Sequence, residues 1–93
     1  MAALEKAQQG LLLLKEAVLE EVANSDSALP HAAIVKRLRL ESDFEGVGRN
    51  YISWSVLGLL VNEGRVMYRG SRTERVYYVK ESQLQSYDCA NPR

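Results

Sequence analysis

The chain has 93 residues, of which 46% are hydrophobic and 26% are charged. These are ordinary values for one small globular domain, and they exclude a disordered or fibrous class. The longest apolar run, Leu11 to Leu14, is far too short to span a bilayer. The N-terminal residues lack the charged-then-apolar order of a secretory signal, and the single cysteine, Cys89, forms no internal disulfide. We therefore expect a cytoplasmic protein without a membrane segment.

The formal net charge of zero conceals a difference between the two halves of the chain. Residues 1–48 contain five Lys/Arg and eight Asp/Glu, a net charge of −3, whereas residues 49–93 contain seven and four, a net charge of +3. Only the C-terminal half would attract a polyanion. This asymmetry is weaker than the basic excess that is typical of an avid DNA-binding protein.

Residues 2–24 are predicted to form a long helix, which the turn-forming residues 24–27 end. Gly10 weakens this helix by about 1 kcal/mol relative to alanine, so residues 1–10 are expected to fray or to form a separate helical extension. The apolar residues recur at steps of three and four along one stripe, which is typical of an amphipathic helix. They are Leu4, Ala7, Leu11, Leu14, Val18 and Val22.

A short second helix is predicted to open at Leu29-Pro30, because proline is tolerated in the first helical turn, where its missing N–H is not needed. Lys36 and Arg37 are expected to point to solvent. Residues 41–48, which include two glycines, form a connection to the next element. The inward-pointing residues of the second helix are Ile34, Val35 and Leu38.

A third helix is predicted from about Arg49 to Glu63. Its apolar residues sweep an arc of roughly 220° at about 100° per residue, whereas a surface helix needs only about 100°. We therefore expect this helix to be buried on more than one side, inside the domain or partly in a partner. Trp54 lies at the edge of the arc and is expected to pack in the core, with a dimer contact or base stacking as alternatives. The remaining strip is Tyr51, Ser55, Gly58 and Asn62.

A hairpin follows the third helix, which Gly64 is expected to end. Residues 65–69 and 74–79 alternate as two strands, and residues 70–73 form a four-residue turn between them. The tail from residue 80 onward is polar. Its candidate docking residues are Leu84 and Tyr87.

The order helix, helix, helix, hairpin resembles the winged helix-turn-helix superfamily of DNA-binding domains. The segments that carry the likeness are LPHAAIVKRL at 29–38 and LGLLVNEGRV at 57–66. The likeness covers residues 11–79, which leaves residues 1–10 as an N-terminal helical extension and 80–93 as a polar C-terminal tail. It implies a mostly α fold with a small β-hairpin (α+β), built from three helices and a two-stranded wing. The long connection at 40–49 and the early start of the first helix depart from the simplest members.

The resemblance implies that helix 49–63 inserts into the major groove and that the hairpin lies against the backbone or minor groove of double-stranded DNA. The strip on the third helix and the residues at its start would contact base edges. The basic residues of the hairpin and of the second helix would contact phosphates, which position a protein without reading sequence. The implied DNA-binding residues are Arg49, Asn50, Tyr51, Ser55, Asn62, Arg69, Arg72, Arg75, Lys36 and Arg37.

Two functions compete at this point. The first is a regulator of transcription, or a DNA-binding subunit of a larger machine. The second is the same fold used for protein contact, which the zero net charge and the wide apolar arc of the third helix favour. The hairpin arginines would then be solvated or paired with Glu74. In either case the leucines outside the main stripe of the first helix predict a homodimer. These leucines are Leu12, Leu13 and Leu19.

The sequence contains no pattern that indicates catalysis, a metal site or a cofactor site. His31, the only histidine, has no partner at ligand spacing and is expected on the surface of a first helical turn. Cys89 lies in the polar tail without a base to activate it. Glu20 and Glu21 point to different faces of a helix, so they do not form an acid–base pair. We expect a protein that is not an enzyme.

Overall fold

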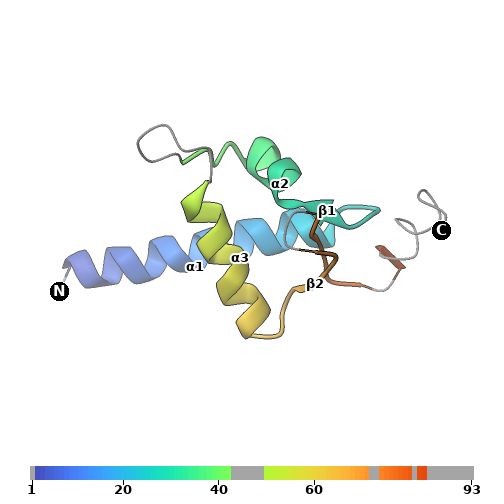
Figure 1. The fold of residues 1–93 in the computed structure, drawn as a ribbon. Helices are drawn as coiled ribbons and strands as arrows, with labels where there is room; N and C mark the ends of the chain where they lie inside the picture. Colours follow the sequence, from blue (N-terminus) through green and yellow to red (C-terminus); the bar gives the residue numbers. More distant parts are fainter. Residues whose placement is uncertain (1, 43–49, 72–73, 81, 84–93) are drawn as a thin grey trace.

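The computed structural model describes residues 2–42, 50–71, 74–80 and 82–83. These residues form a mostly helical fold with a small three-stranded antiparallel sheet, which confirms the expected α+β class at this level. No helix of the described residues combines the length and the hydropathy that crossing a membrane requires. In chain order (Figure 1) the elements are α1 (Ala2–Ala23), β1 (Leu29–Pro30), α2 (His31–Leu38), α3 (Tyr51–Asn62), β2 (Met67–Arg69) and β3 (Val76–Tyr78).

Helix α1 is continuous, and only its C-terminal half packs against the rest of the chain. Val18 and Val22 are fully buried, and Leu11 and Leu14 are partly buried against the core, as the stripe of apolar residues predicted. Residues 2–10 are exposed throughout. Gly10 does not interrupt the helix. The N-terminal half of α1 therefore projects from the domain, as Figure 1 shows.

The segment that was expected to open the second helix forms strand β1 instead. Leu29 pairs with Tyr77 and Pro30 with Val76, antiparallel to β3. A proline disfavours the helical region for the residue before it, which keeps Leu29 extended. The missing N–H of Pro30 is tolerated because β1 is an edge strand of the sheet, whose order is β1-β3-β2. The sheet therefore has one strand more than the predicted hairpin, and α2 begins at His31.

The start of α3 is held by a residue from the other end of the 43–49 connection. The helix begins at Tyr51, later than predicted, because Asn50 adopts a left-handed backbone conformation with φ of 53°. Ser42 then serves as the cap: its Oγ accepts from the Ile52 N–H at 3.1 Å, and its carbonyl accepts from the Tyr51 N–H at 3.2 Å. Asn50 Oδ1 accepts from the Ser42 N–H at 3.2 Å. Two N–H groups at the helix start that lack helical partners are satisfied in this way.

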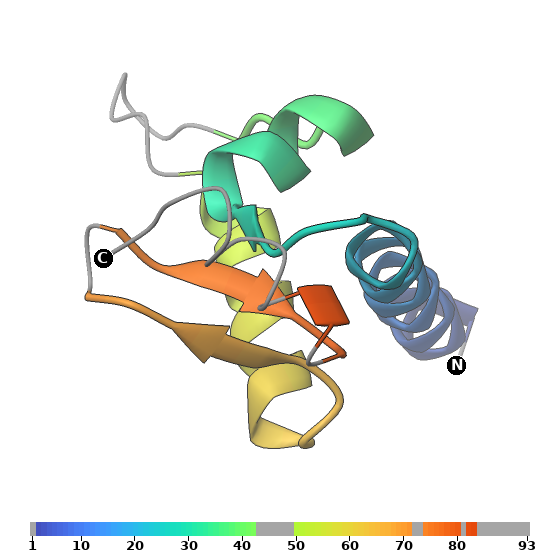
Figure 2. The same ribbon diagram turned by 90° about the vertical axis from the view of Figure 1, so that its right-hand side faces the viewer.

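The core lies where the three helices meet one face of the sheet, and Figure 2 shows α1 almost end-on beside the sheet. Burial of each large aliphatic side chain in such a core contributes about 1.5–3 kcal/mol. The sheet contributes Tyr77 from its central strand, and Leu29 from its edge. The remaining buried core residues are Val18, Val22, Ile34, Val56, Leu57, Leu60 and Val66.

The described residues bury helix α3 on one side only. Its buried residues are Ser53, Val56, Leu57 and Leu60, with Ser53 in the middle of that side. Both edges of the apolar arc are exposed, including Ile52, Leu59 and Trp54. The Trp54 side chain is 57% exposed, so the prediction that it packs in the core was wrong. The reason is its position about 200° around the helix from Val56, which turns it away from the core.

Helix α3 ends as the sequence predicted. Gly64 has a positive φ of 74°, the left-handed conformation in which glycine commonly follows a helix. The N–H groups of Arg65 and Val66 both reach back to the Leu60 carbonyl, at 3.0 and 3.4 Å. The chain therefore reverses direction immediately and leads into β2 beside the helix.

The hairpin strands are shorter than predicted. Tyr68 of β2 is opposite Tyr77 of β3, and Arg69 is opposite Val76. Residues 70, 71, 74 and 75 lie between the strands, and residues 72–73 of the predicted four-residue turn lie outside the described residues. Gly70 has a φ of 103°, and a Cβ added there would lie 2.5 Å from the Glu74 carbonyl oxygen. Only glycine allows the chain to leave the ladder at this point.

Gln83, which lies in the segment predicted to be a polar tail, connects the residues after β3 to the end of α1. Its side chain is 2% exposed. Nε2 donates to the carbonyls of Val22 at 2.6 Å and Ser25 at 2.8 Å, and Oε1 accepts from the Val79 N–H at 2.8 Å. The bond to Val22 satisfies a helix-end carbonyl that lacks a helical partner, and the bond to Ser25 holds the turn that follows α1. Leu84 and Tyr87, the predicted docking residues, lie outside the described residues.

Candidate nucleic-acid interface

The outward face of α3 carries the strip that the sequence singled out. Tyr51, Ser55, Gly58 and Asn62 are all exposed. The large side chain of Trp54 is exposed beside them, so the strip is more apolar than the sequence suggested. Residues 51–62 contain no charged residue. Any attraction of a polyanion to this face therefore comes from neighbouring elements.

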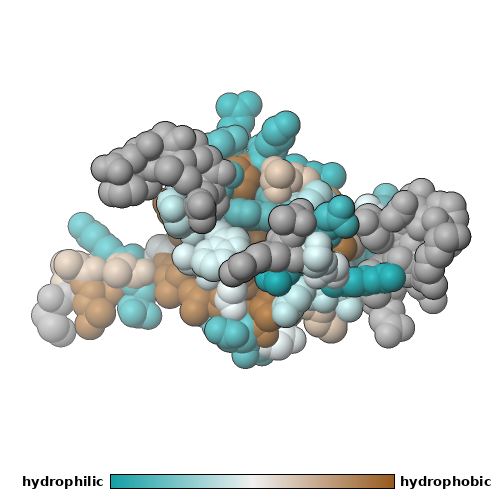
Figure 3. Space-filling model, in the orientation of Figure 1, coloured by the Kyte–Doolittle hydropathy of each residue, from teal (hydrophilic) through white to brown (hydrophobic). Residues whose placement is uncertain are grey.

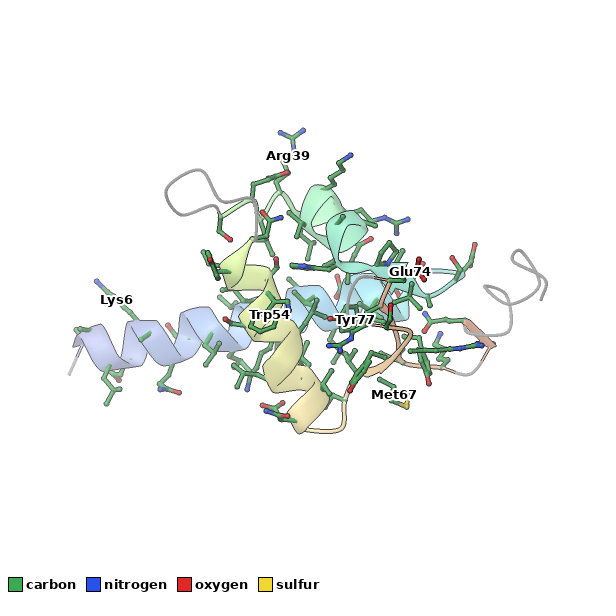
Figure 4. All side chains as sticks on the ribbon, in the orientation of Figure 1. Lys6, Arg39, Trp54, Met67, Glu74 and Tyr77 are labelled. Atoms are coloured by element: carbon green, nitrogen blue, oxygen red, sulfur yellow. The ribbon has the colours of Figure 1, made fainter. Side chains whose placement is uncertain are left out.

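An open groove of about 500 Å³ separates this face of α3 from the sheet. We call it the α3–sheet groove. Trp54 and Tyr77 come from its two walls, and both are labelled in Figure 4. The aromatic rings and aliphatic side chains suit a flat or apolar group, and Asn62 and Ser55 add hydrogen-bonding capacity. The residues that line the groove are Trp54, Ser55, Gly58, Leu59, Val61, Asn62, Tyr68, Arg75 and Tyr77.

Among the described residues that line the groove, Arg75 is the one basic residue. Its guanidinium carbon lies 4.1 Å from the centre of the Tyr68 ring, within the range of a cation–π contact. The Tyr68 and Tyr77 rings are 6.4 Å apart at a tilt of 52°, so the three side chains form one stack. The Nε atom of Arg75 is buried and has no hydrogen-bond partner among the described residues. The stack therefore orients the guanidinium group, and it leaves this N–H donor unsatisfied.

The other predicted basic contacts are dispersed. Arg69 is exposed at the end of β2, and Lys36 is exposed on α2. Arg37 donates to Glu21 of α1 at 3.2 Å, so it contacts α1 rather than α3. Arg49 and Arg72 lie outside the described residues. Of the hairpin arginines, the structure places Arg69 and Arg75 on the same two-stranded unit beside α3.

The start of α3 contains a polar contact that the sequence did not indicate. His31 Nε2 lies 2.7 Å from Ser53 Oγ, and Ser53 Oγ donates to the Asn50 carbonyl at 3.2 Å. Because the hydroxyl has one proton, its oxygen accepts from His31, which defines the Nε2–H tautomer. Partial burial lowers the pKa of His31 below its ordinary value of 6.5. His31 is thus half-buried and bonded, not a surface residue as predicted.

Asn50, a predicted DNA contact, is part of the same polar contact region. Its side-chain oxygen accepts from Ser42, and its carbonyl accepts from Ser53. Asn50 is half-buried, and these hydrogen bonds hold the start of α3 in place. Sequence reasoning missed Ser53, although one signal points to it: it is the only polar residue in the middle of an otherwise apolar helix face.

The other end of α3 is fixed to α1 by charge. Lys15 of α1 donates a hydrogen bond to Glu63, and Arg65 lies 3.6 Å from the same carboxylate. The Lys15 ammonium, which donates that bond, holds the pKa of Glu63 below its usual range. Arg65 is therefore paired with Glu63 at the surface, on the side of α3 that is next to α1.

The described residues do not bring together three or more metal-binding side chains of the His, Cys, Asp or Glu type. The groove contains one oriented cation, aromatic surfaces and small polar groups. These groups are typical of a binding site. Comparison of the chain with family models, with curated proteins and with solved structures finds no match.

Proposed function

We propose that residues 11–79 form a winged helix-turn-helix domain that binds double-stranded DNA, as a regulator of transcription or a DNA-binding subunit of a larger assembly. One observation carries this proposal. The outward face of α3 and Arg75 of the hairpin line the same groove on one side of the molecule. A duplex that received α3 would therefore also meet the hairpin. The order of three helices followed by a hairpin supports the same conclusion.

In this mechanism α3 reads base edges from the major groove, which at about 12 Å wide admits one helix. Asn62 and Ser55 are the exposed polar side chains on its outward face, and asparagine pairs with adenine through two hydrogen bonds. A Cβ added at Gly58 would meet nothing within 4 Å, so the helix backbone is open to close approach at this point. The α3 residues would therefore recognise the base sequence, and they would contribute very little to the electrostatic attraction to DNA.

The hairpin and α2 supply the attraction to phosphates. Arg69 is exposed at the tip of β2, and Arg75 is oriented by the Tyr68 ring. Lys36 is exposed on α2. Each phosphate that a Lys or Arg neutralises steepens the salt dependence of the logarithm of affinity by about 0.9. The small number of these residues gives a shallow slope and modest non-specific affinity, with a dissociation constant of about 10⁻⁶–10⁻⁴ M.

A fluorescence-anisotropy titration with labelled mixed-sequence duplex DNA tests this proposal, from about 50 mM to about 200 mM salt. The test variant is Arg69→Gln, and the matched control is Arg39→Gln. Both remove one exposed positive charge, but Arg39 lies at the end of α2, away from the groove (Figure 4). Arg69→Gln is expected to weaken binding and to reduce the salt slope by about 1, with Arg39→Gln unchanged. Absence of binding at the lowest salt, or equal losses in both variants, would contradict the proposal.

Protein contact is the second candidate function, and the exposure of Trp54 favours it. A large aromatic side chain on the rim of an apolar groove is typical of the central residues of protein interfaces. With Arg75 in the wall, the groove would accept a peptide that combines an aromatic or aliphatic side chain with an acidic one.

A displayed library of random peptides distinguishes this candidate from the first. Enrichment of peptides with acidic and aromatic residues is expected if the groove binds protein. Their affinity would fall with Trp54→Ala and with Arg75→Gln, and remain with Arg39→Gln. A library that yields no such peptides, together with salt-dependent DNA binding, would reject protein contact and leave the first candidate.

A further inference from the structure

The projecting half of α1 carries part of the core stripe into solvent. Leu4, Ala7 and Leu11 follow the same three- and four-residue spacing as Val18 and Val22, so they lie on the core-facing side of the helix. The Leu4 side chain is nevertheless 61% exposed, because no other element in the described part of the chain extends that far. The longest dimension of the molecule is 52 Å, against 29 and 21 Å. Figure 3 shows apolar side chains along this part of α1.

Helix α3 borders the same open space. Ile52, Leu59 and Glu63 lie on one side of α3 at steps of seven and four, and the first two are exposed large hydrophobic residues. Glu63 is bridged to Lys15 of α1, which brings this side of α3 next to α1. The projecting stripe of α1 and this edge of α3 therefore form two apolar walls that meet at an angle. We call this surface the α1–α3 corner.

We propose that the α1–α3 corner is the interface of a homodimer, in which the projecting half of α1 from one copy packs antiparallel against the same half of α1 from the second copy. In this arrangement Leu4 of the partner subunit lies next to Leu11, and the partner's helix extends toward Ile52. The contact is self-complementary, as the interface of a two-fold dimer must be.

The charge of this segment is what favours a second copy as the occupant. Residues 2–14 contain one acid, Glu5, and one base, Lys6, so two identical segments meet without net repulsion. Small residues at Ala7 and Gly10 allow the two helices to approach closely where they cross, and a Cβ at Gly10 meets nothing in the chain itself. A stable interface buries about 800 Å² on each partner. Three side chains do not supply that area, and the edge of α3 adds to it.

Residues 2–10 extend a 22-residue helix whose C-terminal half is packed in the core, and they are exposed throughout. Ordering them costs conformational entropy, which contacts with the described part of the chain do not offset. A second copy of the helix would supply such contacts. This proposal does not depend on whether the protein binds DNA.

Leucine substitutions on opposite faces of α1 provide a matched test. Leu13 is one of the leucines outside the main stripe from which the sequence predicted a homodimer, whereas the interface proposed here uses the stripe itself. Leu4 and Leu13 have similar exposure, 61% and 64%. They are nine residues apart, about 900° around the helix, and so face opposite directions. Sedimentation equilibrium of the full chain from about 1 to 100 µM is expected to show a dimer for the wild type and for Leu13→Glu. Leu4→Glu is expected to weaken the dimer by at least about 100-fold, with the helical circular dichroism of the remaining domain retained.

Three results would overturn the proposal: a wild-type monomer at the highest concentration, a Leu4→Glu dimer as tight as the wild type, or equal weakening by Leu4→Glu and Leu13→Glu. A cross-linking measurement gives a second, independent readout. In a chain with Cys89 replaced by serine, Ala7→Cys is expected to form an intermolecular disulfide. A disulfide needs Cα atoms about 4.4–6.8 Å apart, and position 7 lies where the two helices approach most closely in the proposed arrangement. Gln9→Cys, on the opposite face, is expected to remain reduced, and a disulfide there but not at position 7 would reject the antiparallel arrangement.

Discussion

The imidazole of His31 and the hydroxyl of Ser53 join the first turn of α2 to the first turn of α3 at 2.7 Å. Ser53 is fully buried, so its hydroxyl has no solvent to bond with if the histidine is lost. The same hydroxyl also donates to the Asn50 carbonyl, where the chain enters α3 in a left-handed conformation. This contact therefore sets how α3, the helix that carries the candidate interface, lies relative to α2.

Replacement of Ser53 by alanine is expected to lower the free energy of unfolding by about 1–3 kcal/mol, because the Asn50 carbonyl and His31 Nε2 lose their partner in a partly buried site. Urea denaturation monitored by circular dichroism measures the change. Ser55→Ala is the matched control, since Ser55 is exposed on the opposite side of the same helix. Equal effects at the two positions would show that the hydrogen bonds of Ser53 contribute nothing specific.

Stability is expected to fall as the pH is lowered from about 7.5 to about 5.5, through the titration of His31. Burial lowers the pKa of His31 in the folded chain below 6.5, so the unfolded chain binds more protons between the two values. The stability that comes from neutral His31 is thus fully present above 6.5, and it is lost as the pH falls through that value toward the folded-state pKa. Urea midpoints at the two pH values measure this loss.

The control for this pH dependence is His31→Gln, which retains an N–H donor for Ser53 but does not titrate. His31 is the only histidine in the chain, so this variant is expected to show a nearly flat dependence in the same window. A variant that loses stability as steeply as the wild type would assign the effect to another group.

Gln83→Ala is expected to destabilise the chain by about 2–4 kcal/mol, because buried carbonyls at the end of α1 lose their donor. The affected acceptors include Val22 and Ser25. Ser82→Ala, one residue earlier and exposed, is the control and should change stability by less than about 0.5 kcal/mol. Thermal or urea unfolding measures both, and a small effect of Gln83→Ala would mean that water replaces its bonds.

Gln83→Glu separates hydrogen bonding from side-chain size. The glutamate oxygens can still accept from Val79, but a carboxylate cannot donate to the carbonyls that surround it. Burial next to those carbonyls raises the pKa of a carboxyl group, so its contribution to stability is lost as the pH rises. The variant is therefore expected to be more stable relative to wild type near pH 4 than near pH 7. A constant difference across this range would contradict the assigned bonds.

Two glycines are expected to respond in opposite directions to alanine. Gly70→Ala forces a side chain into a left-handed conformation and against the Glu74 carbonyl, at a cost of about 1–3 kcal/mol. Gly58→Ala enters open space in a helix interior and should raise stability by about 0.5–1 kcal/mol. If α3 enters a DNA groove at Gly58, the stabilised variant should bind duplex DNA more weakly. Unfolding curves and the anisotropy titration measure the two effects separately.

The helices were the most predictable part of the fold. The stripe of apolar residues along α1 and the glycine that ends α3 act through local geometry, so their consequences can be read from spacing alone. Strand β1 was not predictable in this way. It exists because Leu29 and Pro30 pair with residues more than forty positions later in the chain. A proline in the first turn of a helix and a proline at a sheet edge look alike in sequence.

The exposed strip of the candidate interface could be predicted from the sequence, but the contacts of the side chains around it could not. Tyr51, Ser55 and Asn62 were identified by helical spacing, and they are exposed. Trp54 was misplaced because an apolar arc does not show which part of it the rest of the chain covers. The pairing of Arg37 with Glu21 and the stacking of Arg75 on Tyr68 depend on contacts between separate elements.

The sequence by itself determined which segments form helices, where α3 stops, and which helix face is rich in apolar residues, since these follow from steric limits and periodicity within a few residues. The tertiary structure alone decided that the arc of α3 is covered on one side, that Gln83 closes the end of α1, and that half of α1 extends beyond the domain. Each of these depends on how far neighbouring elements reach. Burial is a property of the packed chain, and it is set by contacts between residues that are distant in the sequence.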